Sequence, residues 1–313
     1  MPLEATARLS LQTDSPPALK TYTDLLARAR LLTIEANEAA ILICHHLGIS
    51  RANLIAFAER TVSLELSAAI ECDFAARARG VPVAYLCGVQ EFYGLALSVG
   101  PSVLIPRGDT ETLVDCALAA FNGTEIVHAL DLGTGSGAIA LALKSQRPHW
   151  HITAIDRSEA ALEIACKNAA ALKLDVKFLA GNWFAPVTER YQLILSNPPY
   201  IALDDPHLNQ GDLRFEPTCA LTADAQGFAD LVYIIDNSAR FLHSDGWLML
   251  EHGHLQGPAI KAHLRQTGYI NTNTITDLGG NDRVSVGQWP GRGEAKCGQR
   301  AVFARCFHDG LVN

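Results

Sequence analysis

The sequence has no apolar run long enough to cross a lipid bilayer. A membrane-spanning helix needs about 18 or more consecutive, mostly apolar residues, and the stretch at 39–47 is interrupted by His45 and His46. A secretory signal begins with a basic segment followed by an apolar run, whereas residues 1–15 lack this pattern and carry Glu4 and Asp14. We therefore predict a cytoplasmic protein with no membrane partner.

Paired cysteine motifs are also missing. The eight cysteines never form a C-x-x-C pair, and most stand inside apolar helix or strand patterns. This usage predicts reduced and mostly buried thiols in a reducing compartment. The cysteines are Cys44, Cys72, Cys87, Cys116, Cys166, Cys219, Cys297 and Cys306.

An excess of basic charge is the third absence. The formal net charge is -8 and the pI is about 5.7, so no large positive field is available to neutralise the phosphates of a long duplex. We expect no stable nucleic-acid binding. A basic partner protein is easier to accommodate.

The chain is long and apolar enough for two folded domains. It has 313 residues, 49% of them hydrophobic and 19% charged, and domains of about 100–200 residues are usual. Apolar residues recur at helical spacing in two series, Leu25, Leu26, Ala29 and Leu32 and then Ala39, Ile43 and Leu47, and Gly48 and Gly80 suit helix C-termini. We predict a helical domain at 1–80, a β-hairpin linker at 81–110, an α/β domain at 111–290 and a surface tail at 291–313.

Apolar strand-like and helix-like runs alternate within 111–290. Strands are predicted at 126–132, 151–155, 176–179, 192–196 and 247–251, with helices at 138–144 and 158–172. This alternation is typical of an α/β fold with a parallel sheet covered on both faces. Segments 269–276 and 283–289 predict an antiparallel hairpin at the sheet edge. Ser158 is the expected N-cap of its helix, whose sheet-facing side is expected to hold Leu162, Ala165, Cys166 and Ala169.

A glycine-rich loop follows the first strand of this domain and opens a helix. The segment Asp131-Leu-Gly133-Thr134-Gly135-Ser136-Gly137 lets the backbone turn sharply and lets a ligand approach the free N–H groups of the helix start. Asp156 ends the next strand, where its carboxylate can accept hydrogen bonds from ribose hydroxyl groups. The loop is compatible with a nucleoside-type cofactor, with a dinucleotide, and with a purely structural turn.

The segment Asn197-Pro198-Pro199-Tyr200 directly follows the strand at 192–196, at the edge of the sheet where cofactors bind. The Asn197 side-chain oxygen and the Pro198 carbonyl oxygen are acceptors that can hold both N–H bonds of a planar –NH2 group beside a methyl donor. Tyr200 offers a flat apolar face for a planar amide. Taken alone, the segment also fits a Pro-Pro turn that ends a strand.

Together these motifs resemble the release factor glutamine methyltransferase family. The resemblance runs from about residue 82 to residue 289 and includes D-L-G-T-G-S-G, N-P-P-Y-I, L-I-P-R-G-D-T-E at 104–111, D-L-R-F-E-P at 212–217, L-E-H-G at 250–253 and G-N-D-R at 280–283. It implies a Rossmann-like class I methyltransferase sheet that uses S-adenosylmethionine to methylate a glutamine side-chain amide in peptide chain release factors. The N-terminal helices resemble the substrate-engaging domain of that family less specifically.

The resemblance also implies roles for individual residues. The cofactor-binding set comprises Gly133, Thr134, Gly135, Ser136, Gly137, Asp156, Trp183 and Asn197, with Trp183 near the adenine. The catalytic set comprises Asn197, Pro198, Pro199 and Tyr200. Asn182 stands where the family usually has an aspartate, and Gly108 replaces a proline of the family's I-P-R-P segment. Arg107 and Glu111 are candidates for the substrate entrance or, alternatively, for an ion pair at a helix start.

Alternative functions use the same motifs. A glutamine methyltransferase of ribosomal protein shares N-P-P-Y, an adenine-N6 methyltransferase also acts on a delocalised nitrogen, and a cofactor-binding module would use the loop without catalysis. His252 and His254 resemble a metal pair only superficially, because no further ligand stands at a recognisable spacing. We therefore expect no metal.

Overall fold

The computed structural model describes residues 19–121 and 123–291, and the chain divides into two compact units between Leu86 and Cys87. The predicted surface tail at 291–313 lies almost wholly outside the described residues, as do Cys297 and Cys306. No helix within the described ranges is both long and apolar enough to span a membrane.

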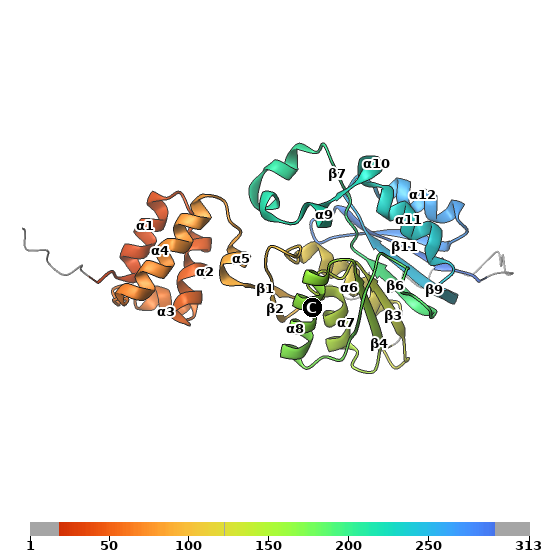
Figure 1. Cartoon of the computed structure of the whole chain (residues 1–313), viewed down its shortest axis with the longest axis horizontal. Helices are drawn as coiled ribbons and strands as arrows, with labels where there is room; N and C mark the ends of the chain where they lie inside the picture. The colour runs from red at the N-terminus through yellow and green to blue at the C-terminus, as the bar shows by residue number, and fades with distance from the viewer. Residues whose placement is uncertain (1–18, 122, 292–313) are drawn as a thin grey trace, which may run out of the picture. The chain divides into compact units, whose positions relative to one another are not determined.

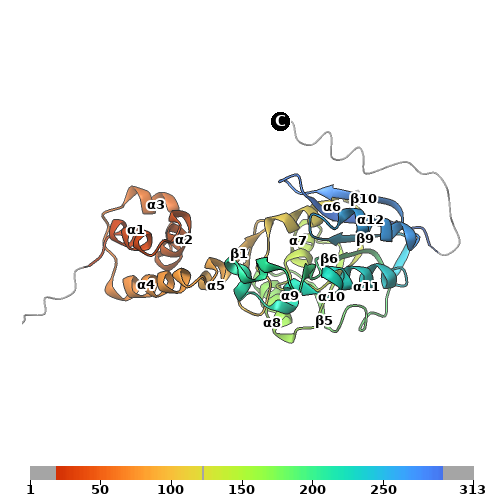
Figure 2. The same ribbon diagram turned by 90° about the horizontal axis from the view of Figure 1, so that it is seen from above.

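The first unit is a cluster of helices (Figure 2), and the side chains buried between them are mostly apolar. Thr21 caps the first helix reciprocally with Asp24, and Ser50 and Ser63 cap two others through their hydroxyl groups, which satisfies backbone N–H groups that a helix start leaves free. The buried side chains include Leu25, Ile43, Ile70 and Phe74. The helices are α1 (Tyr22–Leu31), α2 (Ala36–Leu47), α3 (Arg51–Ala56) and α4 (Leu64–Ala78), followed by the short α5 (Val83–Cys87) at the boundary.

The second unit is built on a seven-stranded sheet within the described residues. Its strand order is β10-β11-β9-β6-β3-β4-β5, and the pairs from β9 to β5 are parallel, whereas β11 pairs antiparallel with both of its neighbours. The strands are β3 (His128–Leu132), β4 (His151–Asp156), β5 (Lys177–Ala180), β6 (Tyr191–Ser196), β9 (Leu242–Glu251), β10 (Ile270–Thr276) and β11 (Asp282–Trp289). The predicted edge hairpin and the predicted α/β fold class are confirmed.

Helices cover both faces of this sheet (Figure 1). Because strand side chains alternate between faces, Leu193 and Leu195 of β6 join the core beneath α6, α7 and α8, while Ile194 joins the core beneath α11 and α12. Both cores consist of buried apolar side chains. The covering helices are α6 (Glu111–Ala119), α7 (Ala138–Gln146), α8 (Glu159–Leu172), α11 (Ala229–Ser238) and α12 (Gly257–Gln266).

A short hairpin precedes the sheet, as the sequence predicts. Strands β1 (Val89–Phe92) and β2 (Leu95–Ser98) pair antiparallel. The buried Asn168 side chain of α8 accepts a hydrogen bond from the Ser98 N–H at 2.7 Å and donates to the carbonyl oxygens of Ser98 and Ser136 at 3.0 and 2.9 Å. One amide therefore ties the hairpin to the glycine-rich loop.

The chain between β6 and α11 forms small elements beside the carboxyl end of the sheet. Strands β7 (Ile201–Ala202) and β8 (Thr222–Ala223) pair in parallel. Gly227 has φ +84°, and a Cβ atom there would lie 2.1 Å from the Tyr200 carbonyl oxygen, so only glycine fits this approach. The remaining elements are η2 (Pro206–Asn209), η3 (Gly211–Phe215), α9 (Thr218–Leu221) and α10 (Asp224–Gly227).

Two predictions about cysteine are wrong. On α8 the buried face contains Leu162, Ala165 and Ala169, but Cys166 is exposed, because each residue advances about 100° around a helix and Cys166 falls beyond the buried stripe. More generally, Cys116 is the buried thiol among the six described cysteines, which are all free. Ser158 does cap α8, accepting from the Ala161 N–H at 3.2 Å.

Replacing Asn168 with alanine should destabilise the second unit. Asn168→Ala leaves the backbone groups of Ser98 and Ser136 without their buried partner, so we expect a loss of at least about 2 kcal/mol in unfolding free energy. Ser158→Ala on the same helix removes one cap and should cost only about 1 kcal/mol. Denaturant unfolding measures the unfolding free energy of both variants. Equal losses would show that the hydrogen bonds of Asn168 stabilise the unit no more than a single helix cap does.

Candidate active site

The sheet changes direction between β3 and β6. From β3 the chain winds outward through β4 to β5 and then returns to β6 on the other side of β3. Such a reversal opens a crevice at the carboxyl ends of the two central strands. The glycine-rich loop begins there after Leu132, and the Asn197–Tyr200 segment begins there after Ser196.

A pocket that opens to solvent lies at this crevice. Its walls come from the loops after β3, β4, β5 and β6 and from the segment after the hairpin, which are far apart in sequence but neighbours at the sheet edge. The lining includes six of the predicted site residues, namely Gly133, Gly135, Asp156, Trp183, Asn197 and Pro199.

The Asp156 carboxylate holds the glycine-rich loop in place. One oxygen accepts from the Gly135 N–H and the other from the Ser158 N–H, each at 2.9 Å. Each carboxylate oxygen has a second lone pair, which remains for ligand hydroxyl groups. Gly133 and Gly135 have φ of +73° and +56°, a region that strains other residues, so the loop shape requires glycine at both positions.

A second acid lies under the loop. Asp131 is fully buried, and one of its oxygens accepts from the Thr134 hydroxyl at 2.6 Å. Burial raises the Asp131 pKa to about 7, the Thr134 hydrogen bond opposes this, and the negative charge of Asp156 adds to it. Thr134 and Ser136 are themselves buried, so these two predicted residues shape the loop from within.

Trp183 forms another wall of the pocket. Its backbone has φ +50°, and its ring lies 3.4 Å from the position that a Cβ atom on Gly133 would take. A hydrogen bond with Trp183 lowers the Asp230 pKa, although burial, the largest effect, leaves that pKa raised. Asn182 and Asp230 line the same pocket. The resemblance leads one to expect a carboxylate at position 182, and in this chain Asp230 provides a carboxylate in the same pocket instead.

Asn197 is oriented by a residue distant in sequence. Its Nδ2 atom donates to the Thr110 hydroxyl oxygen at 3.2 Å. Thr110 is buried at the junction between η1 (Gly108–Thr110) and α6. With Nδ2 engaged in this bond, the Asn197 side-chain oxygen is left to accept from a donor in the pocket.

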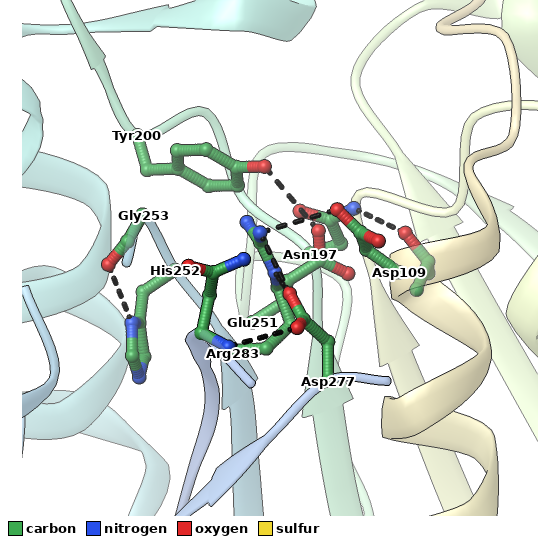
Figure 3. Close-up of polar contacts among 10 residues, drawn as sticks. Asp109, Asn197, Tyr200, Glu251, His252, Gly253, Asp277 and Arg283 are labelled. Atoms are coloured by element: carbon green, nitrogen blue, oxygen red, sulfur yellow. Dashed lines mark hydrogen bonds and ion pairs between the residues drawn. The ribbon is translucent and has the colours of Figure 1, made fainter. Parts of the chain in front are cut away.

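A buried acid stands behind this contact (Figure 3). Glu251, at the end of β9, is 1% exposed, and the Tyr200 hydroxyl group donates to it at 3.3 Å. Burial raises the Glu251 pKa to about 7, while the Thr110 hydroxyl, Arg283 and Tyr200 favour its charged form and Asp109 disfavours it. Burial, followed by the Glu251 charge, also raises the Tyr200 pKa.

Arg283 links this cluster to the edge hairpin. Its guanidinium group contacts Asp109 at 3.1 Å and Asp277 at 3.0 Å, and Figure 3 shows these groups beside Glu251 and Asn197. Glu251, Arg283 and Thr110 lie in segments that carry the family resemblance, but the sequence alone predicts no role for them. Their shared position at the crevice depends on the strand order, which the motifs alone do not predict.

Of the two alternatives for Arg107 and Glu111, the ion pair at a helix start is wrong. Arg107 has an extended backbone and pairs instead with the buried Glu216, which also accepts from the Ile105 N–H at 3.0 Å. Glu111 accepts from the Tyr93 N–H at 2.8 Å. The i, i+4 geometry of a helix is absent, because α6 begins only at Glu111.

The ring of His252 is held by hydrogen-bonding partners within the protein. It is fully buried, its Nε2 atom lies 2.8 Å from the Ser285 hydroxyl oxygen, and its Nδ1 atom lies 2.9 Å from the Gly253 carbonyl oxygen. Burial lowers its pKa. No group of three or more His, Cys, Asp or Glu side chains placed to hold a metal occurs among residues 19–121 and 123–291.

Comparison with known proteins identifies the family. The Methyltransferase small domain profile matches residues 110–210, and the PrmC N-terminal domain profile matches residues 17–88. A release factor glutamine methyltransferase of Vibrio cholerae is 44% identical over 283 residues, covering 89% of this chain and 98% of that protein. One of Escherichia coli is 44% identical over 254 residues, covering 80% and 91%. The chain belongs to the release factor glutamine methyltransferase family.

A solved structure has a similar fold. The crystal structure of a methyltransferase from Pyrococcus furiosus superposes with a TM-score of 0.50 at 19% identity, covering 71% of this chain and 99% of that one. Members of the release factor glutamine methyltransferase family use S-adenosylmethionine as the methyl donor, as the resemblance implies. The dinucleotide alternative for the glycine-rich loop is thereby set aside.

The residues present fit this cofactor. The open space between Gly133 and the Trp183 ring would be filled by a side chain at 133, and nothing lies within 4 Å of a Cβ position on Gly135. These gaps let a ligand reach the loop backbone, while Asp156 offers acceptors for ribose hydroxyl groups and Trp183 a flat face for a purine. Asp156, Trp183 and the glycine-rich loop would therefore hold S-adenosylmethionine.

Removing the Asp156 carboxylate should weaken cofactor binding. We expect Asp156→Ala to lower affinity for S-adenosylmethionine or its demethylated product by at least about 1.5–3 kcal/mol, the scale of a hydrogen bond to a charged group. Glu159→Ala, at an exposed acid on the same helix start, is the matched control and should bind normally. Calorimetry decides the question, and unchanged affinity in a folded Asp156→Ala protein would remove Asp156 from the cofactor site.

Proposed function

We propose that this protein transfers the methyl group of S-adenosylmethionine to the side-chain amide nitrogen (N5) of a glutamine in a peptide chain release factor. Support comes from its relatives, which carry that name at about 44% identity over nearly their whole length. The observation that carries the proposal for this chain is the position of Asn197. Its amide borders the cofactor pocket and is held by Thr110 with the side-chain oxygen left to accept.

An amide nitrogen is a poor nucleophile, because its lone pair is delocalised into the carbonyl group. When bound, S-adenosylmethionine supplies a methyl group on a positively charged sulfur. The Asn197 side-chain oxygen and the Pro198 carbonyl oxygen accept the two N–H bonds of the glutamine amide and orient its nitrogen. As the nitrogen becomes more positive, these same acceptors stabilise the developing charge.

Pro199 and Tyr200 complete the proposed catalytic segment. The two prolines fix φ and carry no N–H group that would compete with the substrate. Tyr200 packs against the core on the α11 and α12 side of the sheet, and its hydroxyl group is engaged with Glu251. Its ring therefore has a fixed position from which to contact a planar amide.

The acidic composition favours a protein substrate over nucleic acid. With a net charge of -8, stable binding to a phosphate backbone is not expected, and a release factor is a component of cytoplasmic translation. The direct test incubates the protein with labelled S-adenosylmethionine and purified release factor, and mass spectrometry locates the label. Ribosomal protein and adenine-containing RNA serve as competing substrates, and a label on either in preference to release factor would contradict the proposal.

Asn197 should carry the chemical step. We expect Asn197→Ala to lower the single-turnover rate of methyl transfer on the order of 10²–10³-fold, as when one preorganised polar group is removed, with little change in cofactor affinity. Neither the glutamine amide nor Asn197 titrates near neutrality, so no pH transition should belong to either group. A folded Asn197→Ala protein that methylates release factor at the wild-type rate would refute this role.

The N-terminal helices should recognise the protein substrate. The unit from Cys87 onward is compact and holds the whole cofactor pocket. A chain that starts near Val81 should therefore keep its cofactor affinity but lose activity on intact release factor. Calorimetry tests the cofactor affinity of the shortened chain, and a methyl-transfer assay tests its activity on release factor. Full activity of the shortened chain would show that the helical unit is dispensable for recognition.

A further inference from the structure

The contact between Thr110 and Asn197 has a direction that the motif itself does not set. A side-chain amide can present either its –NH2 group or its oxygen to a neighbour, and a glutamine substrate needs the oxygen. In the structure the –NH2 group of Asn197 faces Thr110 at 3.2 Å. Some group must favour this orientation over the reverse, because a hydroxyl group can also donate.

The position of Glu251 supplies that preference. A threonine hydroxyl group has one proton to donate and can also accept. An ionised carboxylate only accepts. The Oε2 atom of Glu251 is buried and has no hydrogen-bond partner among the described residues, and the nearby Thr110 hydroxyl group favours the charged form of Glu251. Once the Thr110 proton points at Glu251, Thr110 can only accept from Asn197.

We propose that Thr110 and Glu251 are positioning residues that hold the Asn197 amide with its oxygen toward the substrate. The proposal rests on the proposed function, because it gives Asn197 a reason to need one orientation. Neither residue is assigned contact with the reacting atoms. They act through a directed chain of hydrogen bonds, from the Asn197 –NH2 group to the Thr110 hydroxyl and from that hydroxyl to the Glu251 carboxylate.

The chain should reverse when Glu251 is protonated. A neutral Glu251 can donate to Thr110, which frees the Thr110 proton to point at Asn197 and favours the rotated amide. Burial raises the Glu251 pKa to about 7, so this change falls near neutrality. The groups facing Glu251 are Thr110, Tyr200, Arg283 and Asp109. The ring of the adjacent His252 is engaged with Ser285 and Gly253 instead.

Three variants of the full-length protein separate positioning from a general structural role. Thr110→Val keeps the shape but removes the hydroxyl group, Thr110→Ser keeps the hydroxyl group, and Glu251→Gln carries an –NH2 group that can donate to Thr110 as a protonated acid would. Single-turnover methyl transfer to release factor is measured from pH 6 to about pH 8.5 with both substrates saturating, and calorimetry measures the affinity for demethylated cofactor.

We expect Thr110→Val and Glu251→Gln to slow transfer on the order of 10- to 100-fold, the scale of a misplaced catalytic group, with cofactor affinity unchanged. Thr110→Ser should remain within about threefold of wild type, as the hydroxyl group is retained. The wild-type rate should rise as pH increases through about 7, and this rise should be absent in Thr110→Val and Glu251→Gln.

The outcomes also separate this proposal from the function on which it rests. Wild-type protein that labels no glutamine in release factor would overturn the proposed function and the positioning role together. Active wild-type protein with an equally fast Thr110→Val variant would overturn the positioning role alone. So would a Thr110→Ser variant as slow as Thr110→Val, or a pH rise that persists in Glu251→Gln. Should Thr110→Val fail to fold, Thr110→Ser and Glu251→Gln still decide between these results.

Discussion

The pairing of β3 with β6 is the constraint on which the site depends. The two strands are parallel neighbours with Leu132 opposite Ser196, and the buried Ser196 hydroxyl group donates to the Leu132 carbonyl oxygen at 2.7 Å across 64 residues of sequence. The next residues are Gly133, directly after β3, and Asn197, directly after β6. Because parallel strands end at the same edge, this register places the cofactor loop beside the proposed methyl-accepting site before any side chain makes its own contact.

The sequence predicts the features of the site that are local in the chain. The strand-loop-helix pattern around Gly133 and Gly135, the acid at Asp156 and the N-cap at Ser158 each depend on residues a few positions apart, and the structure has each of them. In contrast, the Thr110–Asn197 contact spans 87 residues, and Thr110 by itself indicates only a helix start. Asn168 likewise looks like one polar residue on a helix, because its partners Ser98 and Ser136 lie elsewhere in the sequence.

The errors have a common physical origin. An ion pair between Arg107 and Glu111 at a helix start requires the two side chains to point toward each other, but the extended backbone at Arg107 directs its side chain to Glu216 instead. Cys166 would be buried only if the apolar stripe of α8 were slightly wider than the stripe that packs on the sheet. In both cases the sequence indicates the segment that holds the side chain. The direction in which the side chain points depends on where the helix starts and how it is rotated, and neighbouring elements decide that.

Buried acids recur where loops must be held still. Asp131 lies under the glycine-rich loop, Glu216 holds the segment before α6, and Glu251 stands behind Asn197, and burial raises the pKa of each. Burying a carboxyl group costs free energy unless it finds partners, and each of these acids accepts from at least one group that would otherwise be free to turn. Because the pKa of each acid nevertheless remains raised, these partners do not fully offset the cost of burial. The fixed position of the loops at the crevice therefore lowers the stability of the fold.

Gly227 shows how far the requirements of the motif extend along the chain. The Tyr200 carbonyl oxygen occupies the space where any side chain at 227 would begin, and Gln256 donates to the carbonyl oxygens of both residues at 3.3 Å. A side chain at position 227 would therefore displace the Asn197–Tyr200 segment, although the mutation replaces no residue of that segment or of the cofactor pocket. A glycine that contributes no side chain to the reaction is thus required for the shape of the segment that does.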